Sequence, residues 1–209
     1  MTLAEFAPAR RMPEEERRAH ILAAAERAFV RYGFHAATMT QVADEAAMSA
    51  GNLYRYFPSK EAIVEGLCLA DQVARSENFA ALASADDLKA AMRAALREHV
   101  LGSPRQKARM IVEIWAESGR NPRVAEFTRR LDHDVMEGMT ELVELAKAKG
   151  VVAETVDARF ASRVLFTLVV GLFRRVALEP DFDFETESAM ALGVLGALFA
   201  GRLTPSVEG

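Results

Sequence analysis

Apolar side chains recur every three or four residues along most of this chain, which is the spacing of amphipathic α-helices. The first helix is expected to begin near Pro13, a favourable first-turn residue, and to end at Gly33 in a left-handed conformation. Eight more helices are expected at residues 39–46, 50–57, 59–79, 86–101, 104–118, 121–149, 157–178 and 185–203. The pattern therefore predicts an all-α protein of about nine helices.

Two of the expected helices are short and lie close together between residues 38 and 58. Thr38 and Gln41 stand three residues apart, which is the spacing of a capping box at a helix start. Ser49 can cap the second short helix, and Pro58 can stop it. The sequence thus predicts two short helices separated by a tight turn.

The second short helix has an unusual composition for its length of about 12 Å. Leu53 and Phe57 are expected to belong to the core. Its other large side chains are an amide, two phenols and a guanidinium, on Asn52, Tyr54, Tyr56 and Arg55. These groups are poor core material, but they suit a surface helix that lies in the major groove of DNA.

The composition supports a helical protein with a substantial core. Half of the 209 residues are hydrophobic, alanine is abundant, and proline and glycine are sparse. The single cysteine, Cys68, excludes an internal disulfide and is compatible with a reducing compartment. No secretory signal is recognised, and the most apolar stretches, 164–173 and 189–199, are shorter than a membrane span. We therefore expect a cytoplasmic protein.

Charge is distributed unevenly along the chain. The whole chain has a net charge of −4, which is unusual for a DNA-binding protein. Residues 1–60 carry eight Lys/Arg against seven Asp/Glu, whereas residues 61–209 carry eighteen against twenty-three. A basic footprint this small implies that tight DNA binding needs two copies of the chain acting together.

The segment 51–61, GNLYRYFPSKE, resembles the recognition helix and the following helix start of TetR-family transcriptional repressors. The upstream run 21–38, ILAAAERAFVRYGFHAAT, is similar to the first helix of that family, and 113–125, EIWAESGRNPRVA, more weakly resembles a stretch of its ligand domain. The resemblance implies a helix-turn-helix DNA-binding domain at 13–60 and a larger helical effector-binding and dimerisation domain at 61–205.

Ten residues in and near the two short helices are expected to contact DNA: Thr38, Thr40, Ser49, Ala50, Gly51, Asn52, Tyr54, Arg55, Tyr56 and Lys60. Hydroxyl and free N–H groups at the two helix starts can bind phosphates, and the missing Cβ of Gly51 lets DNA approach closely. The Arg55 guanidinium can grip O6 and N7 of guanine, while Lys60 can hold a phosphate as a point charge. Asn52 could read a base edge or only support the turn.

Several of these residues have an alternative role that does not involve DNA. Arg55 could be an ordinary surface charge, Thr38 only a helix cap, and Tyr54 partly structural. Residues 1–12, which end with Arg10 and Arg11, are equally compatible with a solvated tail and with an arm on the DNA backbone.

The chain departs from the family pattern at two positions near the turn. Family members often carry lysine at the position of Ala50, so one cationic DNA contact is absent here. The position of Ala47 is usually glycine, and if the turn requires a positive φ there, alanine costs about 1 kcal/mol.

The resemblance also implies a homodimer formed through the last two helices. The last helix carries small residues at helical spacing, namely Gly193, Gly196, Ala197, Ala200 and Gly201. Small side chains allow close approach of a second helix. Alternatively, both helices could simply pack in the core of the monomer.

Apolar and aromatic residues in the middle of the chain are candidates for an effector pocket: His99, Met110, Trp115, Met136 and Phe166. Methionine and aromatic side chains make adaptable walls, which suit a lipophilic or aromatic molecule. Taken singly, each is more typical of ordinary core than of a ligand contact. An acidic partner for a cationic ligand could be Glu113, Glu117 or Asp134.

The functional classes that compete with a ligand-responsive repressor are an enzyme, a transcriptional activator and a small-molecule-binding protein. The four histidines lie far apart without metal-ligand spacing, and no nucleophile has an evident base, so neither an enzyme nor a cofactor or metal site is expected. A transcriptional activator would use the same DNA contacts. A helical small-molecule-binding protein without DNA binding remains a further alternative.

Overall fold

The computed structural model describes residues 13–101 and 104–203. Within those ranges the chain forms nine α-helices and one π-helical segment, and no β-strand. The helices are α1 (Glu14–Tyr32), α2 (Met39–Glu45), α3 (Ala50–Tyr56), α4 (Lys60–Ser84), α5 (Leu88–Ala95), η1 (Leu96–Leu101), α6 (Arg105–Ser118), α7 (Pro122–Ala148), α8 (Ala158–Leu178) and α9 (Phe184–Phe199). The predicted all-α fold is confirmed. The arm with Arg10 and Arg11 lies outside the described residues.

Three helices differ from the sequence-based expectation. α4 continues to Ser84 because residues 80–84 contain no proline or glycine that could stop it at Phe79. The end of the expected fifth helix, from Leu96, is wound as a π-helix, which a periodicity pattern over six residues cannot distinguish from an α-helix.

The third difference is the end of α9, which stops at Phe199 rather than Leu203. Gly201 has a φ of +69°, which glycine adopts without steric cost. Its N–H donates to the carbonyl of Leu198, and the N–H of Arg202 donates to the carbonyl of Ala197. This pair of bonds is a Schellman motif, which satisfies the last carbonyls of the helix.

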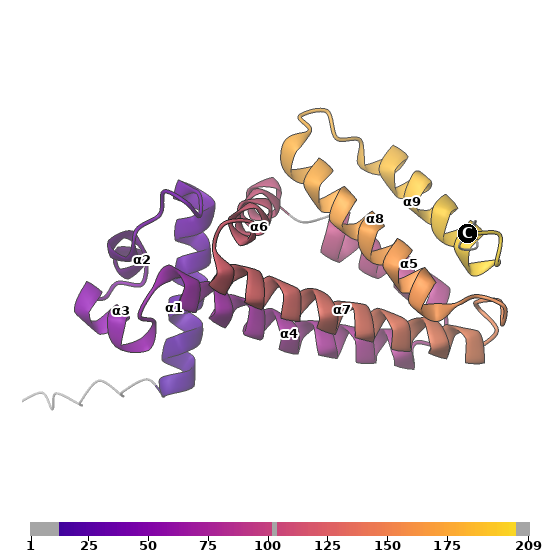
Figure 1. Cartoon of the computed structure of the whole chain (residues 1–209), viewed down its shortest axis with the longest axis horizontal. Helices are drawn as coiled ribbons and strands as arrows, with labels where there is room; N and C mark the ends of the chain where they lie inside the picture. Colours follow the sequence, from indigo (N-terminus) through magenta and orange to yellow (C-terminus); the bar gives the residue numbers. More distant parts are fainter. Residues whose placement is uncertain (1–12, 102–103, 204–209) are drawn as a thin grey trace, which may run out of the picture.

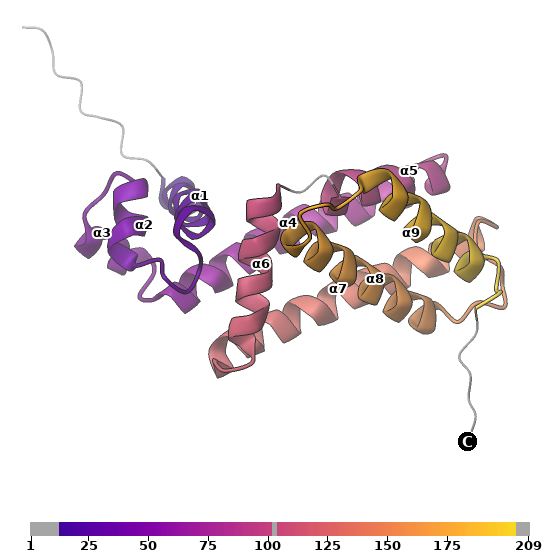
Figure 2. The same cartoon turned by 90° about the horizontal axis from the view of Figure 1, so that it is seen from above.

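The helices are arranged around one long parallel pair, in which Gln72 of α4 meets Asp134 of α7 and Phe79 meets Gly138 farther along. Figure 1 shows α1, α2 and α3 grouped at one end of the molecule, with α4 and α7 running side by side from that group toward the other end. α8 and α9 lie on one side of this pair, and α6 lies between the α1–α3 group and α8 in both views (Figures 1 and 2). No helix among the described residues is long and apolar enough to cross a membrane.

Two large buried clusters hold the structure together. One joins the α1–α3 group to the starts of α4 and α7 and to α6. Its members include Phe29, Val42, Leu53, Phe57, Ile63, Val64, Met110, Ile114 and Val124. The other joins α7, α8 and α9 around residues such as Val143, Ala161 and Leu198. Because the first cluster continues past residue 60, packing does not mark a boundary there, and the division into domains at 60/61 stays a prediction.

Candidate nucleic-acid interface

α2 begins with the predicted capping box. The Thr38 hydroxyl accepts a hydrogen bond from the N–H of Gln41 at 3.2 Å, and the Gln41 side-chain oxygen accepts one from the N–H of Thr38 at 2.8 Å. Val42 and Ala43 are buried, whereas Thr38 and Thr40 are exposed. The helix therefore packs inward while its first turn stays open to solvent.

The turn after α2 has the strained conformation considered from the sequence. Ala47 has a φ of +51°, and it is the only non-glycine residue with positive φ in the described part of the chain. The N–H of Met48 donates to the carbonyl of Ala43, which closes the turn. The turn therefore places Ala47 at a positive φ, which is the condition under which alanine was expected to cost free energy.

α3 has one buried and one exposed face. The Ser49 hydroxyl caps it by accepting from the N–H of Asn52 at 3.2 Å. Leu53 and Phe57 are buried, as predicted, whereas Tyr54 keeps 51% of its surface exposed. Arg55, Ser49 and Gly51 are exposed, while Ala50, Asn52 and Tyr56 are half-buried.

The exposed face of α3 is open to close approach. A Cβ placed on Gly51 would meet no atom within 4 Å. Gly51, Tyr54 and Arg55 are three and four residues apart, so they lie on one side of the helix. This side is the surface that could enter a DNA groove.

α1 supports the two short helices by bonds that the sequence pattern did not reveal. The guanidinium of Arg18 lies 4.4 Å from the centre of the Phe57 ring and donates to the carbonyl of Tyr56. His20 Nε2 lies 3.0 Å from the carbonyl oxygen of Ala46, and Arg27 donates to the carbonyl of Glu45. These α1 side chains thus bind carbonyl groups at the ends of α2 and α3, which have no partner within their own helices.

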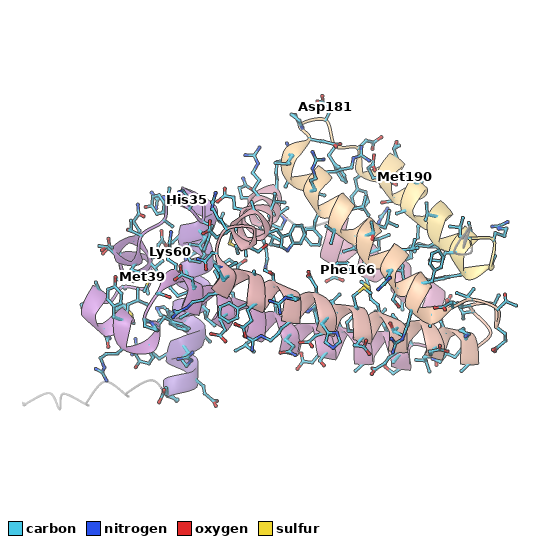
Figure 3. The ribbon with its side chains drawn as sticks, viewed as in Figure 1. His35, Met39, Lys60, Phe166, Asp181 and Met190 are labelled. Atoms are coloured by element: carbon cyan, nitrogen blue, oxygen red, sulfur yellow. The ribbon has the colours of Figure 1, made fainter. Side chains whose placement is uncertain are left out.

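Lys60 has a different set of partners from the one expected. Its ammonium group donates to the carbonyls of Phe34 and His35 at 3.0 and 2.9 Å, and His35 and Lys60 lie near each other in Figure 3. These long-range bonds could not be predicted from the spacing of residues along the chain. Because an ammonium has three donors, one N–H is left for the predicted phosphate contact.

The predicted effector residues occupy several environments. Met110 is 6% exposed and packs in the cluster that includes the α1–α3 group. Trp115 is half-buried, with its ring edge-to-face against Phe173 at 6.3 Å. Met136 and Phe166 are half-buried, and Phe166 lies on the α7 side of α8 (Figure 3). The side chain of His99 lies outside the described part.

Two cavities lie between α4 and α7, with volumes of about 540 and 230 Å³. Neither is lined by Met110, Trp115, Met136 or Phe166. Gln72, Arg75 and Asp134 border both, and the Gln72 amide donates to the Asp134 carboxylate at 2.7 Å. Asp134, one of the three acidic residues predicted as possible ligand partners, borders both of these cavities.

Burial changes the acid–base behaviour of two groups beside these cavities. It raises the pKa of the Cys68 thiol to about 11, so this group stays protonated at neutral pH. Burial also lowers the pKa of Arg75, whose Nη2 is buried without a hydrogen-bond partner among the described residues.

α9 has an inner and an outer apolar face. Leu195 and Leu198 are buried in the monomer, while Met190 on the other side is 44% exposed (Figure 3). Gly193 and Gly196 are exposed, and a Cβ on either would meet nothing within 4 Å. The expectation that α9 packs in the monomer core and the expectation that it offers a surface to a second copy are therefore compatible.

Two family models match the chain. The model of bacterial regulatory proteins of the tetR family matches residues 21–67. The model of the C-terminal part of BetI-type transcriptional repressors matches residues 84–200. Together they cover α3 and most of the other helices.

Individual proteins match over nearly the same length. The HTH-type transcriptional regulator UidR of Escherichia coli K12 is 32% identical over 193 residues, which cover 90% of this chain and 94% of UidR. The structure of GusR from Salmonella enterica has a TM-score of 0.72 and 29% identity, covering 90% of this chain and 99% of GusR. FadR from Bacillus subtilis, in complex with stearoyl-CoA, has a TM-score of 0.69 at 19% identity, covering 88% and 98%.

Proposed function

This chain belongs to the TetR family of bacterial transcriptional regulators, which are not enzymes, and we propose that it is a ligand-responsive repressor. Regulators of this family bind DNA and small-molecule effectors and act as dimers. The repressor would bind a palindromic operator as a homodimer and leave it when a small lipophilic or aromatic effector binds. The match of residues 84–200 to the C-terminal part of BetI-type transcriptional repressors supports repression rather than activation.

The exposed face of α3 carries this proposal. Tyr54 and Arg55 project from a helix whose other side is fixed by buried Leu53 and Phe57. A hydroxyl and a guanidinium on a rigid, exposed helix are the groups that bind phosphate and guanine. We assign base reading to Arg55 and phosphate binding to Tyr54, to the hydroxyls of Thr38, Thr40 and Ser49, and to the N–H groups that begin α3.

Dimerisation through α8 and α9 would give the spacing that operator binding needs. Two α1–α3 groups (the DNA-binding heads) that are related by a two-fold axis can enter successive major grooves about 34 Å apart. Exposed Met190, Gly193 and Gly196 on α9 support this surface, because small residues beside an apolar one allow close helix packing.

The effector would bind among helices α5 to α8. Half-buried Trp115, Met136 and Phe166 support an apolar ligand, since aromatic and methionine side chains adapt to such molecules. FadR from Bacillus subtilis, which shares the fold, was crystallised with stearoyl-CoA, a lipophilic molecule. A ligand that favours one spacing of the two heads would shift the population away from the DNA-bound form.

Selection from a library of random DNA duplexes tests the proposal. We expect an imperfect palindrome, bound by a dimer, and repression when this site is placed over a promoter in a transcription assay. Arg55→Ala should relax discrimination at one base pair per half-site by about 1–3 kcal/mol. The exposed Arg129 of α7 provides the control, because Arg129→Ala removes the same charge from a helix that is not expected to contact DNA. Recovery of no preferred sequence, or activation from the selected site, would contradict the proposal.

A further inference from the structure

Phe34, in the loop between α1 and α2, is held through its main chain by two other helices. Its N–H donates to the Glu113 carboxylate of α6 at 2.5 Å. Its carbonyl accepts from the Lys60 ammonium, at the first residue of α4. The Phe34 ring is also buried, edge-to-face against Phe29 at 5.2 Å. One residue thus joins α1, α4 and α6.

The residue before it makes this approach possible. Gly33 has a φ of +79°, and a Cβ there would lie 3.2 Å from Glu113 Oε2. A larger residue would be strained by its backbone and would also press on the carboxylate. The glycine therefore admits Glu113 to the loop as well as ending α1.

α6 is attached to the α1–α3 group at a second point. Lys107 forms an ion pair with Glu26 of α1 at 2.9 Å. Met110 and Ile114, on the same side of α6, are buried in the cluster of that group. The spacing of these contacts covers nearly two turns, which fixes the direction of α6 as well as its position.

The other side of α6 is attached to the end of α8. Arg105 donates to the carbonyl of Glu179 at 2.7 Å, and Arg109 donates to the carbonyl of Ala177 at 2.9 Å. Trp115 lies against Phe173 of α8. A 14-residue helix thus links α8 directly to the loop that leads into α2.

We propose that Glu113 is a positioning residue for operator binding. Its carboxylate fixes the Phe34 peptide, and through it the α1–α3 group, at one angle to α6 and α8. This inference rests on the proposed function, because a fixed angle matters when two heads must match two half-sites at once. Loss of the carboxylate leaves each recognition helix intact but lets the separation of the two heads vary.

The bond itself is tested on the free protein. Hydrogen exchange at the Phe34 amide should speed up on the order of tenfold in Glu113→Ala, and Glu113→Gln should restore much of the protection because an amide oxygen still accepts. Glu126 of α7 provides the matched control, since its carboxylate pairs with Arg130 and is 57% exposed. Equal exchange in wild type and Glu113→Ala would overturn the proposal without touching the proposed function.

The positioning role is tested with the selected operator and a second duplex in which one base pair is inserted between the half-sites. The insertion moves one half-site by about 3.4 Å and turns it by about 35°. Wild type and Glu126→Ala should bind the altered duplex on the order of tenfold more weakly, whereas Glu113→Ala should lose only about threefold.

The ratio of the two affinities separates positioning from stability. A variant that is merely less folded binds both duplexes more weakly and keeps the wild-type ratio, and that result would overturn the proposal. A wild-type protein that selects no operator would overturn both the proposed function and the positioning role that rests on it, while the exchange result would still report on the Phe34 bond.

Discussion

At the scale of single residues, Ala47 carries backbone strain where the recognition helix is about to begin. Its φ of +51° puts a Cβ in a conformation that suits glycine. We expect Ala47→Gly to raise the free energy of unfolding by about 1 kcal/mol, measured by urea denaturation. Ala70→Gly, at an exposed position inside α4, should instead lower it by about as much. Destabilisation by both substitutions would show that the turn is not strained.

A substitution at Gly51 can test the proposed DNA contact separately from folding. Because a Cβ there meets nothing within 4 Å, Gly51→Ala should leave stability unchanged or raise it by up to about 1 kcal/mol. The same methyl group would stand between α3 and DNA, so operator affinity should fall about tenfold, or 1.4 kcal/mol. Urea denaturation and a fluorescence anisotropy titration check the two halves. Undiminished affinity would remove Gly51 from the interface.

Cys68 should be unreactive in the native state. The thiolate is the reactive form, and a pKa raised to about 11 by burial leaves little of it at pH 8. We expect an aromatic disulfide reagent to react on the order of a hundred times more slowly with native than with urea-unfolded protein. The native rate should rise about tenfold per pH unit from 8 to 10, and a plateau by pH 9 would contradict the raised pKa.

At the scale of helices, the pairing of α4 with α7 depends on a glycine. A Cβ on Gly138 would lie 2.7 Å from Cε2 of Phe79, so the two helices would have to separate or the ring would have to move. Gly138→Ala should therefore cost about 1–3 kcal/mol in thermal or urea unfolding. Adding Phe79→Leu, which removes the opposing ring edge, should recover part of the loss. Additive costs in the double variant would mean that the two residues do not meet.

The sequence predicted the helices well because caps and breakers act locally. Thr38 with Gln41, and Ser49 with Asn52, satisfy N–H groups within four residues of themselves, so the starts of α2 and α3 could be placed from spacing alone. The family resemblance added the expected role of α3. The π-helical turn at Leu96 was missed because a six-residue segment is too short for its period to be read.

The interactions that orient helices could not be predicted in the same way. Glu113 reaches Phe34 across 79 positions of sequence, and Lys60 reaches it across 26. Periodicity contains no information about such pairs, because each residue is an unremarkable charge on its own helix. For this reason Lys60 was expected only at a phosphate, and the roles of Arg18, His20 and Arg27 were not foreseen.

At the scale of the whole molecule, the outer face of α9 is the proposed contact between two copies of the chain. Gly193 and Gly196 are exposed beside Met190. If a partner helix approaches there, Gly196→Leu should raise the dimer dissociation constant at least about tenfold by blocking that approach. Sedimentation velocity measures the dimer, and circular dichroism should show the helices unchanged.

Ala70→Leu is the control for added bulk, because Ala70 lies on an exposed side of α4. It should leave the dissociation constant as it is in wild type. A Gly196→Leu protein that remains dimeric would place the contact between copies on another surface.

Apart from the Lys107–Glu26 ion pair, the polar contacts described between α6 and its neighbours end on main-chain atoms: the N–H of Phe34 and the carbonyls of Ala177 and Glu179. A bond to a main-chain atom does not require a particular side chain at that position. The attachment of α6 therefore depends little on the side chains at Phe34, Ala177 and Glu179. The α1–α3 group could be exchanged for one that reads another operator. The bond to α6 should be kept wherever a glycine still stands before the residue whose N–H donates to Glu113. A chimeric protein made in this way should inherit its DNA preference from one parent and its inducer from the other.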